Sequence, residues 1–159
     1  MFAISISAFV MSLLSWVHVW VYQRRKLSIR IVNYLPLRNE HNFFLSFENE
    51  SRLPVLVTRI WLLSDCGKRL ECLVTPSTIF EITRTKGEKE MSRESIKNLQ
   101  MPLAISGLGG LSGWITFVDP HKTLVPLSTV ANFQVHTNRG GPFRMTLPLV
   151  RGHLDHHMF

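Results

Sequence analysis

The sequence is poor in cysteine, with only Cys66 and Cys72 among its 159 residues. Both lie in the segment WLLSDCGKRLECLV, which predicts a hairpin that turns at 66–67 or 67–68 and places Cys72 opposite residue 61 or 63. Cys66 and Cys72 therefore do not face each other across the hairpin. Because a disulfide needs Cα atoms about 4.4–6.8 Å apart, we expect two free thiols. Free thiols favour a reducing compartment, and two cysteines alone supply too few ligands for a metal site.

Aspartate, glutamate, lysine and arginine are missing from residues 1–23, where His18 is the one ionisable side chain. A helix over residues 2–22 would be roughly 31 Å long at about 1.5 Å per residue, which matches the hydrocarbon core of a bilayer. A cleaved signal peptide would need a positively charged start and a small-residue cleavage site, and the sequence offers neither. We therefore predict a retained transmembrane anchor over residues 1–23.

A basic flank, residues 24–26, follows the apolar segment directly. Under the positive-inside rule these cations lie in the cytoplasm, so the N-terminus is expected outside and the rest of the chain inside, as in a single-pass membrane protein. Aromatic rings near the flank would form a belt at the membrane interface. The predicted interface residues are Trp16, Trp20, Tyr22, Arg24, Arg25 and Lys26.

Small side chains recur along one face of the predicted anchor helix. Ser5, Ala8, Ser12 and Ser15 are separated by three, four and three positions. Because small residues let transmembrane helices approach closely, this face could mediate self-association or contact with a partner helix. Chance recurrence in a serine-rich segment is the alternative interpretation.

The remainder of the chain shows short alternating or β-branched segments separated by turn residues. The predicted strands cover 27–32, 43–49, 54–63, 70–74, 78–83, 102–106, 114–119, 131–137 and 143–149. This spacing is typical of an all-β sandwich or barrel, and the size of about 120 residues favours an immunoglobulin-like sandwich. The predicted fold class is therefore mainly β, with an N-terminal transmembrane helix followed by an immunoglobulin-like antiparallel β-sandwich over residues 27–150 and a flexible tail at 151–159.

Details of this sandwich can also be predicted. Residues 49–52 supply turn residues for a hairpin between 43–49 and 54–63, and the densely charged segment 84–98 is expected to be a loop with some helical character. The glycine-rich segment 107–113 is expected to be a flexible connection between strands. Trp61 and Trp114 are expected in the core.

Candidate sites for chemistry are few. His153, Asp155, His156 and His157 could bind a divalent metal through imidazole and carboxylate groups, but nothing rigid orients them, so they are weak metal candidates. The segment GLGGLSG precedes a predicted strand, whereas a phosphate loop or a nucleophile elbow needs a following helix. No catalytic residue and no cofactor is predicted. Basic residues are not interleaved with exposed aromatics, so nucleic-acid binding is not expected either.

The anchor followed by RRK, FENESRLPVLVTRI and PLAISGLGGLSGWITF resembles short membrane-anchored β-sandwich proteins of Gram-positive bacteria and their prophages. The resemblance implies the fold and the anchoring, and it carries no activity. We expect a non-enzymatic module, tethered to the membrane, that binds a protein partner through sheet edges or loops on the cytoplasmic face. The alternatives are a small accessory subunit of a larger membrane complex and a membrane-tethered hydrolase.

Overall fold

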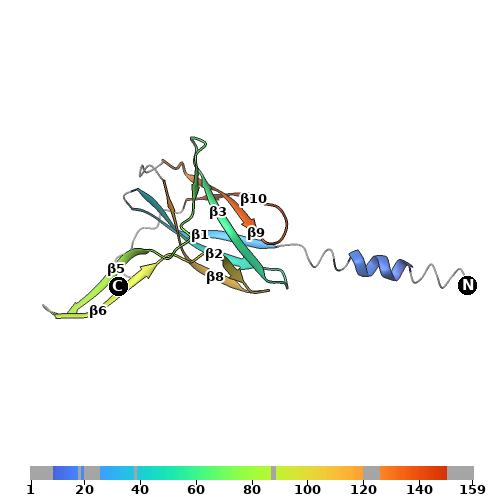
Figure 1. Ribbon diagram of the computed structural model, residues 1–159, viewed down its shortest axis with the longest axis horizontal. Coiled ribbons are helices and arrows are strands. Elements are labelled where there is room, and N and C mark those ends of the chain that lie inside the picture. The colour runs from blue at the N-terminus through green and yellow to red at the C-terminus, as the bar shows by residue number, and fades with distance from the viewer. Residues whose placement is uncertain are drawn as a thin grey trace, which may run out of the picture.

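A computed structural model describes residues 9–17, 19, 26–37, 39–86, 89–119 and 126–149. This part of the chain forms two antiparallel sheets packed face to face, a separate two-stranded hairpin and a short helix at residues 9–17 (Figure 1). It is therefore mainly β, as predicted. The predicted tail, residues 151–159, lies outside the described residues.

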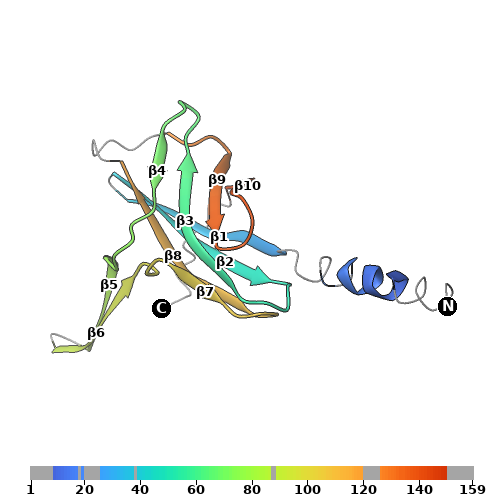
Figure 2. The same ribbon diagram turned by 45° about the vertical axis from the view of Figure 1, so that its right-hand side comes forward.

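The chain passes from the first sheet to the second after β2, returns to the first for β8, and ends in the second. The first sheet has the order β1 (Leu27–Leu37), β2 (Glu40–Asn49), β8 (Gly110–Val118). The second has the order β10 (Phe143–Pro148), β9 (Val130–Thr137), β3 (Val55–Leu63), β4 (Arg69–Glu71), and β7 (Leu103–Ile105) pairs with β3 on the same edge as β4 (Figure 2).

Aromatic rings fill the space between the sheets. Phe43 points inward from β2, and its ring centroid lies 5.2 Å from that of Phe133 on β9 and 5.8 Å from that of Phe117 on β8, both edge to face. All three side chains are buried. Such ring pairs stabilise beyond the effect of their buried area. Leu45 and Phe47 continue the inward row of β2.

The sandwich builds its core without the helix. The core cluster runs from Ile29 to Val135, and the partly buried side chains packed against it lie between Leu27 and Leu149. Every described member therefore belongs to the sheets and their connections. Residues 27–149 thus form a folding unit with its own hydrophobic core.

The predicted hairpin between 43–49 and 54–63 is wrong, because β2 and β3 lie in different sheets. The chain crosses between the sheets after Asn49, whose side chain satisfies the backbone of the crossing. Its amide nitrogen donates to the carbonyls of Leu53 and Ser106, both at 2.9 Å. Its amide oxygen accepts from the backbone N–H of Ser51 at 3.0 Å. Local turn composition cannot distinguish such a crossing from a hairpin.

The described residues of the charged segment 84–98 lie mostly in strands, so the predicted loop is wrong for them. β5 (Thr78–Lys86) and β6 (Lys89–Lys97) pair as an antiparallel hairpin. Glu81 and Arg93 form an ion pair across the hairpin. Charged side chains remain solvated on such a ribbon while its backbone groups bond across the pair, so charge density alone does not indicate a loop.

Two other boundaries move from their predicted places. β1 continues past residue 32 to Leu37, with a bulge at Val32, and Pro36 is tolerated because β1 is an edge strand. β8 begins at Gly110, within the expected flexible connection. A Cβ on Gly113 would lie 2.7 Å from side-chain carbons of Leu99, so a larger residue here would have to displace the Leu99 side chain.

The hairpin between β3 and β4 is confirmed, but neither predicted register is, because Cys72 lies opposite Ile60 rather than residue 61 or 63. The N–H of Cys72 donates to the carbonyl of Ile60 at 3.2 Å. Both thiols are free, with Cys66 exposed and Cys72 buried. Trp61 and Trp114 are half-buried on the outer faces of the sheets, so their predicted core position is wrong.

Replacing Phe43 with alanine tests the central role of its ring. The Phe43→Ala variant of a fragment spanning 26–159 should lose about 3–5 kcal/mol of unfolding free energy, because the cavity between the sheets cannot collapse fully. Chemical denaturation measures the loss. The control is Val32→Ala, at a bulge where the side chain is 53% exposed, and it should change stability by less than about 0.5 kcal/mol. Equal losses in the two variants would contradict this assignment of the core.

Candidate functional site

The helix at residues 9–17 exposes apolar side chains around its whole circumference. Trp16 is 76% exposed and Phe9 is 68% exposed. The other exposed apolar residues of this region are Val10, Met11, Leu13, Leu14, Val17 and Val19. A helix that is apolar all round is normally buried in a protein core or a bilayer, and the core of the sandwich does not include it.

Within the described residues, no helix combines the length and the apolar character needed to cross a membrane. Of the predicted anchor, residues 1–8, 18 and 20–23 lie outside the described part of the chain. The predicted span over residues 1–23 therefore stays a prediction.

The predicted interface and packing residues are only partly described. Trp16 and Lys26 are exposed, whereas Trp20, Tyr22, Arg24 and Arg25 lie outside the described residues. Ser12 and Ser15 lie in the helix, whereas Ser5 and Ala8 lie outside the described residues. Both sets stay predictions.

The hairpin of β5 and β6 is fixed to the first sheet by aromatic rings. Trp114, on the outer face of β8, has its ring centroid 5.9 Å from that of Phe80 on β5 and 5.4 Å from that of Phe44 on β2, both edge to face. These contacts explain why Trp114 is half-buried outside the main core. Sequence alternation marks all three aromatics but cannot show that they meet.

A buried asparagine fixes the polar groups at the base of this hairpin. The side-chain oxygen of Asn98 accepts from the N–H of Ser77, and its amide nitrogen donates to the carbonyl of Thr75 at 3.2 Å. The N–H of Leu99 then donates to the carbonyl of Trp114 at 2.7 Å. These hydrogen bonds therefore fix the position at which β5 and β6 leave the sandwich.

Beyond that base, the hairpin projects from the sandwich (Figures 1 and 2). Within the described part of the chain, β5 and β6 pair only with each other. Their outer edges therefore present backbone N–H and C=O groups that a further strand could pair with. Charged side chains such as Glu81 and Arg93 flank these edges and would select among partners.

A cluster of half-buried rings and exposed charged side chains lies on the outer face of the second sheet. The ring centroids of Trp61 and His136 are 4.5 Å apart, and the guanidinium carbon of Arg69 is 5.9 Å from the Trp61 ring. Arg59 and Glu71 form a salt bridge beside them at 3.8 Å. The sequence gives little indication of this cluster, because its members come from three strands of the sheet.

The described residues provide no metal centre. Among them, no group of three or more histidine, cysteine, aspartate or glutamate side chains could hold a metal ion. The weak candidates His153, Asp155, His156 and His157 lie outside the described residues.

The described histidines make contacts of a structural kind. His41 is buried, and its Nδ1 lies 2.8 Å from the hydroxyl of Tyr34. His136 lies against Trp61, with its Nε2 3.3 Å from the amide nitrogen of Gln134. These contacts lend no support to a hydrolase.

The two thiols differ in chemistry. The Ser64 hydroxyl lies 2.8 Å from the sulfur of Cys66 and lowers the pKa of that thiol by hydrogen bonding to the thiolate. Burial raises the pKa of the Cys72 thiol. Cys66 is therefore the more reactive thiol of the pair.

Comparisons with known proteins give no family. No protein-family model matches the chain, and no curated protein matches it. Among solved structures, the ApaA protein from Bordetella pertussis aligns at 11% identity with a TM-score of 0.35, covering 80% of this chain and 97% of its own. The GH20 exo-β-N-acetylglucosaminidase from Vibrio harveyi aligns at 12% identity with a TM-score of 0.32, covering 81% of this chain and 19% of the enzyme. Likenesses this distant carry no argument about function.

Proposed function

We propose that the protein is a single-pass membrane protein that presents an immunoglobulin-like sandwich as a non-enzymatic protein-interaction module on the cytoplasmic face of the membrane. One observation carries the proposal. The helix at residues 9–17 exposes apolar side chains on all sides, and the sandwich has a complete core without them. In water this surface would be costly, whereas a bilayer would bury it.

The sequence around the helix supports a membrane span that is longer than residues 9–17. Residues 1–23 contain no acidic residue, lysine or arginine, and the anchor proposed over them has the length that a bilayer requires. The Trp16 ring and the flank 24–26 would lie at the cytoplasmic interface. The resemblance to membrane-anchored β-sandwich proteins of Gram-positive bacteria and their prophages belongs to the same proposal.

The strand order supports the immunoglobulin-like classification. The order β1–β2–β8 in one sheet faces the order β10–β9–β3–β4 in the other. Two antiparallel sheets with consecutive strands distributed between them are the arrangement of immunoglobulin-like sandwiches. The hairpin of β5 and β6 then stands as an insertion between β4 and β7.

Two side chains support the cytoplasmic placement of the sandwich. Cys66 is an exposed free thiol, which a reducing compartment preserves. Asn49 begins the sequon Asn49-Glu50-Ser51, but it is 2% exposed and its amide is fully engaged in the crossing between the sheets. The sequon is therefore explained by structure and gives no reason to place the domain in a secretory lumen.

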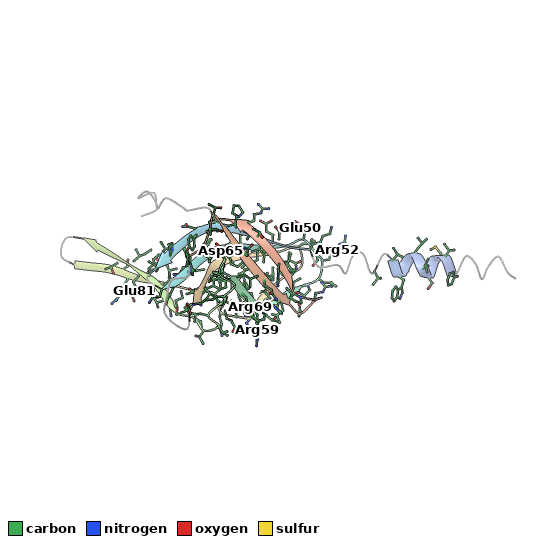
Figure 3. All side chains as sticks on the ribbon, turned by 90° about the horizontal axis from the view of Figure 1, so that it is seen from above. Glu50, Arg52, Arg59, Asp65, Arg69 and Glu81 are labelled. Carbon is green, nitrogen blue, oxygen red and sulfur yellow. The ribbon has the colours of Figure 1, made fainter. Side chains whose placement is uncertain are left out.

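The projecting hairpin is the proposed contact for a protein partner. Figure 3 places Glu81, on the hairpin, at one end of the sandwich and Glu50 and Arg52 at the other. Because β1 begins beside Glu50, a tether at that end directs the hairpin away from the bilayer. A partner strand could add to an edge of the hairpin, and the tether would raise its effective concentration near membrane-bound partners.

Arginines in the helix should release the protein from membranes. In the full chain, the double replacement Met11→Arg and Leu14→Arg should cost about 5–7 kcal/mol of insertion free energy. Alkaline washing of membranes should leave the wild-type chain in the pellet and move most of the variant to the supernatant. The matched control is Val32→Arg with Val74→Arg, two equally exposed valines of the sandwich, which should stay in the pellet. Release of the wild-type chain would contradict the tether.

The native thiol Cys66 reports the orientation. A membrane-impermeant maleimide should label the full chain only after the cells are opened, because the exposed and reactive Cys66 lies inside. The Cys66→Ser variant should take up no label under either condition, since Cys72 is buried. Labelling of intact cells would place the sandwich outside.

A photo-crosslinker on the hairpin should capture the partner. Introduced at Thr83, an exposed position of β5, it should give adducts at the membrane. The matched position is Arg144, exposed on the edge strand β10, where adducts should be much weaker. Equal adducts at both positions, or adducts at Arg144 alone, would exclude the hairpin as the main contact.

A further inference from the structure

Two exposed leucines lie on adjacent loops at one end of the sandwich. Leu53, in the crossing after β2, is 42% exposed, and Leu108, between β7 and β8, is 70% exposed. The two loops are bonded together, because the N–H of Leu108 donates to the carbonyl of Ser51 at 2.8 Å. Exposed leucines on neighbouring loop tips form an apolar surface that the fold of the sandwich does not need.

Leu108 is also held in an unfavourable backbone conformation. Its φ is 52°, in the left-handed region that favours glycine, and it lies between Gly107 and Gly109. The bond to Ser51 and the bond from the N–H of Gly109 to the carbonyl of Ser106, at 3.2 Å, fix the turn. Strain that directs a large apolar side chain into solvent, where glycine would fit without cost, indicates a role for that side chain.

This end of the sandwich is where the chain arrives from the anchor. The N–H of Glu50 donates to the carbonyl of Lys26 at 2.9 Å. Lys26, the residue directly before β1, therefore lies beside the loop that carries Leu53. Lys26 and Arg52 are exposed cations here, and Glu50 is an exposed acid. Figure 3 labels Arg52 and Glu50 at this end. In the sequence, Lys26 is the last of three consecutive cations, after Arg24 and Arg25.

We propose that this end, defined by Lys26, Arg52, Leu53 and Leu108, docks on the cytoplasmic leaflet of a bilayer that contains anionic lipid. The two leucines enter the interfacial layer, and the cations contact the headgroups. The inference rests on the proposed membrane tether, since β1 begins directly after the flank and leaves no spacer between the anchor and the sandwich. Docking would fix the direction in which the β5–β6 hairpin points.

A fluorescent probe tests the docking in the full chain. In a Cys66→Ser background, an environment-sensitive fluorophore is attached to a Leu53→Cys or Leu108→Cys variant reconstituted in vesicles of phosphatidylcholine, with or without phosphatidylserine. Lipids that carry a quencher in the interfacial region report contact with the bilayer. The matched control is Val74→Cys, at a valine that is 53% exposed. Its neighbour Leu73 donates its N–H to the carbonyl of Thr116, which lies in the half of β8 farther from the Leu108 loop. Cys72 is buried and should remain unlabelled.

Quenching at positions 53 and 108 should be several-fold stronger than at position 74, and phosphatidylserine should increase it. Equal quenching at all three positions in a chain that resists alkaline washing would overturn the docking and leave the tether intact. A chain that alkaline washing removes from the vesicles would overturn the tether and the docking together.

Discussion

The contact between Phe43 and Phe133 joins the two sheets, and the rest of the molecule depends on it. These rings, with Phe117, fill the space between the inner faces and leave both sheets buried against each other. Within the described residues, the core of this sandwich contains no side chain of the helix at residues 9–17. The apolar surface of that helix therefore needs another environment, and a bilayer is the one that its sequence surroundings favour.

Polar side chains organise the two ends of the sandwich. Asn49 ties the crossing between the sheets to the β7–β8 loop, and in doing so it places Leu53 and Leu108 on neighbouring loops. Asn98 plays the corresponding part at the base of the β5–β6 hairpin. Each asparagine satisfies buried backbone groups that would otherwise be costly, and each positions a surface for which we propose a partner. One end would face lipid and the other a protein.

Part of this arrangement could be predicted from the sequence. The strands predicted over 43–49 and 131–137 correspond to β2 and β9, and the turn predicted after residue 63 leads to the hairpin of β3 and β4. Long-range features could not be predicted in this way. Whether β2 pairs with β3 or crosses to another sheet depends on contacts distant in sequence, and the pairing of Glu81 with Arg93 requires a strand opposite a charged segment. The left-handed conformation of Leu108 is likewise set by its bond to Ser51.

Amide hydrogen exchange of the full chain in vesicles tests most directly whether the apolar helix is buried in lipid. We expect the amides of residues 9–17 to exchange as slowly as those of the core strands, because the hydrocarbon region excludes water and keeps the helix bonds closed. A solvated helix of this length would be only marginally stable. Rapid exchange at residues 9–17 alongside a protected sandwich would contradict the membrane tether.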